Sequence, residues 1–211
     1  MPSPKPIIGI VGGIGSGKTY VSNLLKELGC LVIHSDDQVR EAYQRDDVKG
    51  LLKSRWGDGV FKPDGSVNRQ AVSGIVFARP EERVWLEHLL HPMVTHDRDE
   101  IMARHANDPG VRAFVWNTPL LFETGLNAHC DSIVFVDTPA DVRAARVTST
   151  RGWASSELAR REILQWPLDK KLKMSDHALQ YTADAEDFRG QVRAIFSRIL
   201  EPTATESDLG M

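Results

Sequence analysis

The sequence predicts an α/β fold in which helices flank a parallel sheet, and three observations near the start of the chain lead to this prediction. The apolar run at 6–11 (PIIGIV) is typical of a short buried strand. Apolar residues then recur at helical spacing from Val21 to Leu28, and Gly29 supplies a stop signal. A second apolar run follows at 30–33 (CLVI). Strand, helix and strand in this order predict a βαβ unit with a parallel sheet.

Further along the chain, three more apolar runs resume the strands. They lie at 112–116 (RAFVW), at 132–136 (SIVFV) and at 177–181 (HALQY), and we expect the last to be an edge strand. Apolar residues from Phe188 to Ile199 then recur at the spacing of an amphipathic helix. The strand–helix alternation is interrupted at about 46–105, which we expect to be mostly helical.

These elements predict one domain over 1–201 with two helical additions. We expect the core at about 6–45, 106–142 and 175–200, a helical insertion at about 46–105, a helical basic segment at about 143–174 and a disordered tail at 202–211.

Composition places the chain among ordinary globular proteins. Of its 211 residues, 41% are hydrophobic and 26% are charged, and the formal net charge of −3 gives no reason to expect a nucleic-acid or membrane partner. Cys30 and Cys130 form no metal-ligand spacing and are expected to be reduced thiols. The start, MPSPKP, has no leader-like apolar stretch. We therefore expect a cytoplasmic protein.

A glycine-rich loop follows the first predicted strand and precedes the first predicted helix. The stretch GGIGSGKT, from Gly12 to Thr19, meets the pattern G-x-x-x-x-G-K-[ST] in the βαβ context that this motif requires. In such a loop backbone N–H groups cradle phosphates, the lysine reaches the outer phosphates and the hydroxyl binds Mg²⁺. The sequence therefore predicts a P-loop NTPase core that uses ATP and Mg²⁺, with Thr19 as the metal ligand. The predicted ATP-binding residues are Gly12, Gly13, Ile14, Gly15, Ser16, Gly17, Lys18, Thr19 and Tyr20.

The basic segment is the chain's main charge asymmetry. Eight basic and three acidic residues lie between Arg143 and Lys173, on a chain that is otherwise acidic. Such a segment is either a solvated helix face or a lid that closes over a polyanion and excludes water. Because water would compete with an alcohol acceptor, a lid favours a kinase over a simple hydrolase.

A kinase also needs a carboxylate that orients the acceptor hydroxyl and takes its proton. Asp36 and Asp37 follow the second predicted strand. We favour Asp36 for this role, the alternative being that Ser35, Asp36 or Asp37 caps a helix. Glu123 is a second candidate acid, which a loop salt bridge would equally explain.

At this point the residues resemble one family, the dephospho-coenzyme A kinases. GGIGSGKT resembles the family's phosphate loop, VIHSDDQVRE its D-A-D segment, and PLLFE at 119–123 a family hallmark. DGSVNR at 64–69 and LEHLLHP at 86–92 resemble its acceptor-domain signatures, and REILQWPLDKKLKMSD at 161–176 its R-x-x-x-Q…K…A-D pattern. The resemblance runs from about Ile7 to Phe196. The chain departs from the family pattern at Val11, His34, Ser175 and Tyr181.

The resemblance implies transfer of the γ-phosphate of ATP to the ribose 3′-hydroxyl of dephospho-coenzyme A, the last step of coenzyme A synthesis. It implies that Asp36 faces the acceptor hydroxyl and that Arg146 or Arg151 is the lid arginine over the donor phosphates, so that the expected catalytic residues are Asp36, Lys18, Arg146 and Arg151. The partners implied are these two small molecules, for a monomer or weak homo-oligomer. The acceptor-binding residues that it implies are Asp36, Asn68, Arg69, His91, Leu121, Glu123, Arg161 and Gln165.

Two alternatives remain. The first is another small-molecule P-loop kinase, of the nucleoside or nucleotide type. The second is a nucleotide-binding protein without a transfer reaction. The sequence has no N-K-x-D guanine motif, which disfavours a GTP-specific switch.

Overall fold

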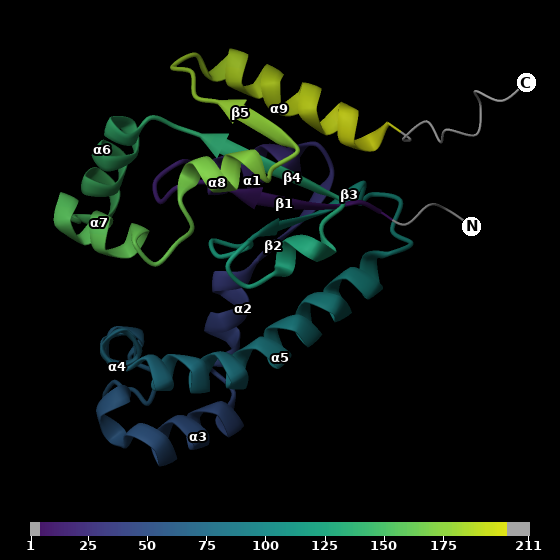
Figure 1. Cartoon of the computed structure of the whole chain (residues 1–211). Coiled ribbons are helices and arrows are strands. Elements are labelled where there is room, and N and C mark those ends of the chain that lie inside the picture. The colour runs from purple at the N-terminus through teal and green to yellow at the C-terminus, as the bar shows by residue number, and fades with distance from the viewer. Residues whose placement is uncertain (1–4, 202–211) are drawn as a thin grey trace, which may run out of the picture. The chain divides into compact units, whose positions relative to one another are not determined.

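The computed structural model describes residues 5–201, and the tail expected at 202–211 lies outside them. Contacts divide the chain into two compact units (Figure 1). The sheet unit consists of the described residues before His34 and after His105, and the helical unit is His34–His105. The helical unit thus begins before residue 46, where we expected the insertion to start. The finer division into core, insertion and lid stays a prediction.

The sheet unit is built on five strands in the order β2-β3-β1-β4-β5. Strand β1 pairs in parallel with both β3 and β4, with Ile8 opposite Val115 and Ser132, and β4 pairs in parallel with β5. The predicted α/β fold with a parallel sheet is confirmed. Strand β3 lies between β1 and β2, so the first two strands of the chain are not neighbours. The strands are β1 (Ile7–Val11), β2 (Cys30–His34), β3 (Ala113–Asn117), β4 (Ser132–Asp137) and β5 (His177–Gln180).

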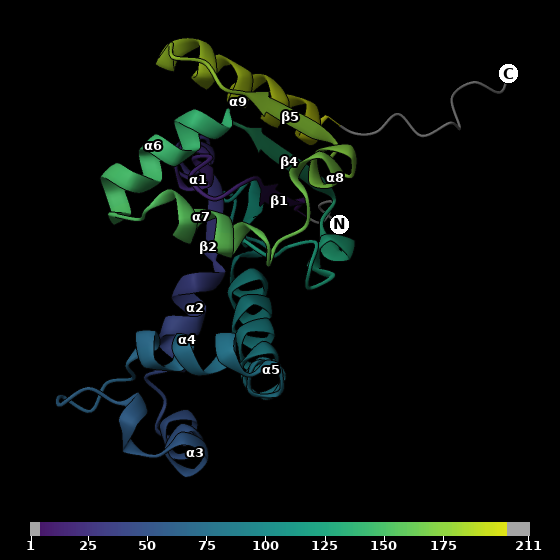
Figure 2. The ribbon, with the colours of Figure 1, turned by 60° about the vertical axis from the view of Figure 1, so that its left-hand side comes forward.

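Helices α1 and α9 pack against each other and bury apolar side chains of the strands (Figure 1). The apolar residues of α1 recur at helical spacing, which places Val21, Leu24 and Leu25 in this core. Helix α9 adds Phe188 and Phe196. Helices α6 and α7 contact each other, as Figure 2 shows, and α8 contacts β4. The helices of the sheet unit are α1 (Lys18–Glu27), α6 (Ala140–Arg151), α7 (Ser155–Glu162), α8 (Leu168–Lys173) and α9 (Ala185–Leu200).

Strand β5 lies at an edge of the sheet, as predicted. Gln191 of α9 bonds the backbone of this strand with both ends of its side-chain amide. Its Oε1 accepts a hydrogen bond from Gln180 N at 3.0 Å, and its Nε2 donates one to Gln180 O at 3.2 Å. The amide thus satisfies two backbone groups that an unpaired edge would leave to water.

The helical unit contains α2 (Ser35–Ala42), α3 (Asp46–Trp56), α4 (Arg69–Ala78) and the long α5 (Pro80–His105). Buried Glu82 of α5 joins it to α3, because its carboxylate accepts hydrogen bonds from Arg55 Nε at 2.9 Å and Trp56 Nε1 at 2.8 Å. These bonds lower the pKa of Glu82. Within residues 5–201, no helix is long and apolar enough to cross a membrane.

Candidate functional site

The glycine-rich loop joins β1 to α1 through backbone conformations that other residues rarely adopt. Gly15 and Gly17 have φ values of +79° and +97°. A Cβ at Gly15 would also lie 2.7 Å from the carbonyl oxygen of Arg143, so a side chain there would collide with the backbone of α6. Glycine is therefore required both by the turn and by the close packing of α6 on the loop.

Lys18, the first residue of α1, folds back over this loop. Its Nζ donates hydrogen bonds to the carbonyl oxygens of Gly12 and Gly13, each at 2.9 Å. The ammonium group thus lies on the loop, at the N-terminus of a helix whose dipole also favours anions. Thr19 and Tyr20 follow, and both are exposed.

Ser16 and Thr138 join the loop to the carboxyl end of β4. The Thr138 hydroxyl donates a hydrogen bond of 2.9 Å to the carbonyl oxygen of Ser16, and both residues are buried. The Ser16 Oγ is buried and has no hydrogen-bond partner among the described residues. An orphaned buried hydroxyl in a phosphate loop marks a position where a ligand would supply the missing bond.

Helix α6 brings two arginines to the loop. Arg143 donates from Nη1 to Ile14 O at 3.3 Å and forms an ion pair with Glu162 of α7. One turn later, Arg146 donates from Nη1 to Ser16 O at 3.2 Å and to Gly15 O at 3.4 Å. Arg146 was an expected site residue, whereas Arg143 was not singled out; its spacing of three residues from Arg146 on one predicted helix was the available signal.

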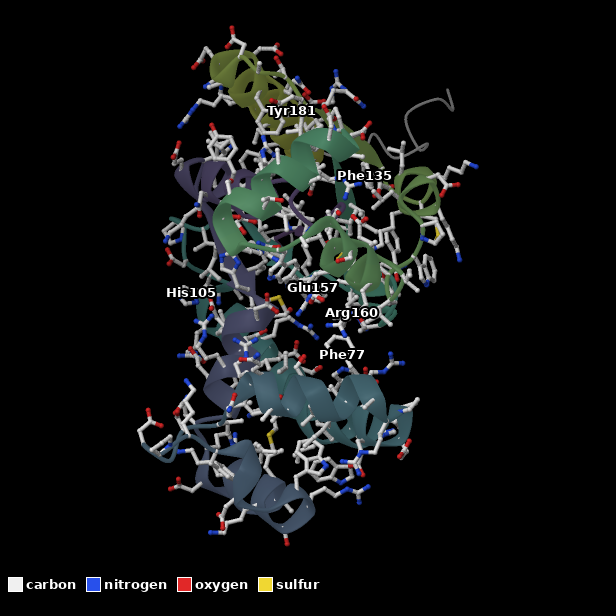
Figure 3. All side chains as sticks on the ribbon, turned by 90° about the vertical axis from the view of Figure 1, so that its left-hand side faces the viewer. Phe77, His105, Phe135, Glu157, Arg160 and Tyr181 are labelled. Atoms are coloured by element: carbon white, nitrogen blue, oxygen red, sulfur yellow. The ribbon has the colours of Figure 1, made fainter. Side chains whose placement is uncertain are left out.

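A cavity of about 470 Å³ opens beside the loop. Gly17, Arg146 and three aromatic residues are among those that line it. The rings of Tyr20 and Phe188 stack with centroids 6.0 Å apart, and the Arg146 guanidinium lies 5.2 Å from the ring centroid of Tyr181 (labelled in Figure 3). A cavity with aromatic walls at one end of a phosphate loop suits a planar base. Sequence reasoning did not assign Tyr181 or Phe188 to a site.

Glu123 forms a buried ion pair instead of facing solvent. Its Oε1 lies 2.8 Å from Lys171 Nζ and accepts a hydrogen bond of 2.7 Å from the backbone N of Trp166. Lys171 is fully buried, and its Nζ also donates to Gln165 Oε1 at 3.4 Å. The salt bridge that was the alternative for Glu123 is therefore present, and it brings Glu123 and Gln165 together. Leu121, another expected acceptor-binding residue, is fully buried.

Two further arginines of the basic segment lie against Trp153. The guanidinium of Arg151, at the end of α6, is 4.9 Å from the Trp153 ring centroid, and that of Arg161 in α7 is 4.2 Å away. Arg161 also donates from Nε to Glu157 Oε1 at 2.6 Å. The structure thus places Arg146 against the loop and Arg151 on Trp153.

In the helical unit, Asp36 lies in the first turn of α2 and is exposed. Its carboxylate makes no hydrogen bond or ion pair within the described part of that unit, whereas Asp37 pairs with Arg40 at 2.7 Å. The N-cap residue is His34, which makes no side-chain capping bond. Asp36 therefore does not cap α2.

Three other expected acceptor-binding residues lie in this unit. Asn68 caps α4, because its Oδ1 accepts hydrogen bonds from the backbone N of Gln70 and of Ala71, each at 3.2 Å. Arg69 and His91 are exposed, on α4 and α5. Asn68 therefore stabilises the N-terminus of α4.

Known proteins are similar to this chain in sequence and in architecture. The sequence profile of the family described as dephospho-CoA kinase matches residues 6–187. A dephospho-CoA kinase of Geobacillus kaustophilus is 32% identical, over 90% of this chain and 95% of its own length. The crystal structure of TT1252 from Thermus thermophilus superposes with a TM-score of 0.81 at 30% identity, over 93% of this chain and 98% of that one.

A more distant structure has the same fold. The dephospho-CoA kinase from Campylobacter jejuni superposes with a TM-score of 0.66 at 20% identity, over 92% of this chain and 96% of that one. The family match spans residues 6–187, which is most of the chain. The chain therefore belongs to the dephospho-CoA kinase family.

Proposed function

We propose that the chain transfers the γ-phosphoryl group of ATP to the ribose 3′-hydroxyl of dephospho-coenzyme A, with Lys18 and Arg146 on the donor and Asp36 on the acceptor. Family membership carries the overall activity, which is ATP-dependent phosphorylation of dephospho-coenzyme A in coenzyme A biosynthesis. The assignment of residues rests on one observation above all. A phosphate loop that carries a lysine and an arginine on its carbonyl oxygens lies directly beside a cavity with aromatic walls.

On the donor side, the loop and its cations provide positioning and charge neutralisation, which are the main needs of phosphoryl transfer. Lys18 would exchange its bonds to Gly12 O and Gly13 O for bonds to phosphate oxygens. Arg146 would keep the triphosphate aligned from the α6 side, and the base would occupy the cavity by Tyr181. We propose that the segment 143–174 closes over the donor as a lid and excludes water.

Mg²⁺ is part of the proposal. Residues 5–201 contain no cluster of three His, Cys, Asp or Glu side chains that could hold a metal ion. Mg²⁺ keeps several waters and binds through one or two protein oxygens together with substrate phosphates, so the exposed Thr19 hydroxyl at the start of α1 fits it. The ion would neutralise phosphate charge there.

On the acceptor side, Asp36 would orient the ribose hydroxyl and accept its proton as the oxygen attacks phosphorus. Its exposed and unpaired carboxylate in the helical unit supports this role. The other acceptor-binding residues of the proposal are Asn68, Arg69, His91, Leu121, Glu123, Arg161 and Gln165. We place the enzyme in the cytoplasm, as a monomer or weak homo-oligomer.

The acceptor is tested by incubating the purified chain with ATP, Mg²⁺ and a panel of alcohols. We expect dephospho-coenzyme A to gain one phosphate in the mass spectrum, and adenosine, AMP, pantetheine and shikimate-like alcohols to react far more slowly. Binding energy of the remote pantetheine arm should appear partly in turnover, so adenosine should be a poor acceptor even at saturation. A higher kcat/KM with another alcohol would contradict the acceptor, and no acceptor-stimulated ATP consumption at all would make the chain a nucleotide-binding protein.

Replacing Lys18 by Met tests the donor site. The change removes the charge that stabilises the outer phosphates, and we expect a loss of about 3 kcal/mol or more of transition-state stabilisation, a fall of at least about a hundredfold in kcat/KM. Lys26→Met is the matched control, because Lys26 is exposed at the other end of the same helix. Steady-state kinetics with ATP measure the change. Near-normal turnover of a folded Lys18→Met variant would contradict the assignment of Lys18 to the donor site.

A further inference from the structure

The corner between α6 and α7 holds a tryptophan in a fixed backbone position. Helix α6 ends at Arg151, Gly152 follows with φ of +65°, and Trp153 lies just before α7 begins at Ser155. The hydroxyl of Thr148 donates a hydrogen bond of 3.2 Å to the carbonyl oxygen of Trp153. The backbone of Trp153, whose side chain is half-buried, is therefore anchored on the same helix that carries Arg146.

Two arginines from different helices lie against this one indole, with guanidinium-to-centroid distances of 4.9 Å for Arg151 and 4.2 Å for Arg161. Both distances fall within the range of a cation–π contact. Glu157 of α7 also accepts hydrogen bonds from Arg161 and from Arg160; Glu157 and Arg160 are labelled in Figure 3.

Electrostatic repulsion opposes this arrangement of the two arginines. Two guanidinium groups held at one ring repel each other, and each long side chain gives up rotamer freedom. The negative face of the indole offsets both effects, while Glu157 compensates one charge of the cluster. The result is a pair of positive groups oriented before any ligand arrives, which reduces the ordering that a phosphate ligand must otherwise impose.

We propose that Trp153 is a positioning residue that holds Arg151 and Arg161 ready for the pyrophosphate groups of the substrates. The inference rests on the proposed function, in which Arg161 binds the acceptor and Arg151 belongs to the segment 143–174 that closes over the donor. Trp153 acts through the arginines and does not touch a reacting atom. A purely structural role, in which the indole only fills the corner between α6 and α7, is the competing explanation.

The test compares Trp153→Leu and Trp153→Phe in the full chain. Leu removes the π face, and we expect the dissociation constant of ATP or of dephospho-coenzyme A to rise about fivefold to tenfold, as measured by calorimetry and by KM. Phe keeps a ring and should restore most of the affinity. Trp85→Leu is the matched control, because the Trp85 ring of α5 also carries a guanidinium, that of Arg55 at 5.1 Å, and Trp85 is not among the proposed site residues; the affinities of this variant should stay near those of the unchanged chain.

A double variant separates the two explanations. If Trp153 acts through Arg151, adding Trp153→Leu to Arg151→Gln should weaken binding less than the product of the single effects. Full multiplication of the effects, or a lower melting temperature with unchanged affinities for both ligands, would overturn the inference. The ATP titrations need no acceptor, so failure of dephospho-coenzyme A to react would contradict the proposed function while the ATP arm still decides on Trp153.

Discussion

Replacing Asp36 by Asn is expected to lower kcat by about two to four powers of ten while ATP affinity changes little. The amide keeps the size and hydrogen-bonding capacity of the carboxylate but cannot accept the proton of the ribose hydroxyl, and general-base catalysis contributes an effect of about this size. Two to four powers of ten correspond to roughly 3 to 5 kcal/mol of transition-state stabilisation. Rapid-quench or steady-state kinetics at saturating substrates measure the change directly.

The chain offers a control for Asp36 one residue away. Asp37 lies in the same first turn of α2, so Asp37→Asn removes the same favourable charge from the helix N-terminus, together with its exposed ion pair to Arg40. Each substitution should therefore lower the helix stability by at most about 1 kcal/mol. Equal turnover of the two variants would show that Asp36 serves only the helix and not the chemistry.

Replacing Lys171 by Met is expected to destabilise the sheet unit by about 3–5 kcal/mol. The substitution leaves the carboxylate of Glu123, whose side chain is only 13% exposed, without its cation, and a buried charge that loses its partner typically carries a penalty of this size. The Oε2 atom of Glu123 is buried without a hydrogen-bond partner among the described residues, which increases the free-energy penalty of the unpaired carboxylate. Equilibrium unfolding in urea measures the difference.

Two further variants tell a charge effect from a packing effect. Lys173→Met changes an exposed lysine of the same helix, and its unfolding free energy should stay within about 0.5 kcal/mol of that of the unchanged chain. Combining Lys171→Met with Glu123→Leu removes both charges and should recover much of the loss, because an apolar pair avoids the desolvation of two ions. A double variant less stable than Lys171→Met alone would refute this account.

Local patterns predicted most of the sheet unit. The five apolar runs became the five strands, and Gly29, with φ of +91°, ends the first helix as its position indicated. The phosphate loop was predictable because its pattern spans only eight residues and its conformation depends on its own glycines. The position of β3 between β1 and β2 was not predictable from these runs, because pairing in a parallel sheet is decided by contacts between segments far apart in the sequence.

The candidate site shows the same limit. The contacts of Arg143 and Arg146 with the loop use backbone carbonyl oxygens, which every residue has. The spacing of the two arginines places them on one helix face, but no sequence pattern identifies the loop as their partner. Glu123 and Lys171 are 48 positions apart. The family pattern at 161–176 matches Lys171, but no local pattern predicts that this lysine is buried against Glu123 while Lys170 and Lys173 are exposed. The burial of a charged side chain is decided by the partner that tertiary packing supplies.

The side chain of Gln191 has a consequence for how copies of this chain meet in a crowded solution. Its amide offers Gln180 one acceptor and one donor, the same two groups that the backbone of an adjacent strand would present. A strand of another molecule that paired with Gln180 would first have to displace an internal partner that is already tethered to α9. At this one position, the side chain of α9 thus takes the place that the backbone of a sixth strand would otherwise occupy.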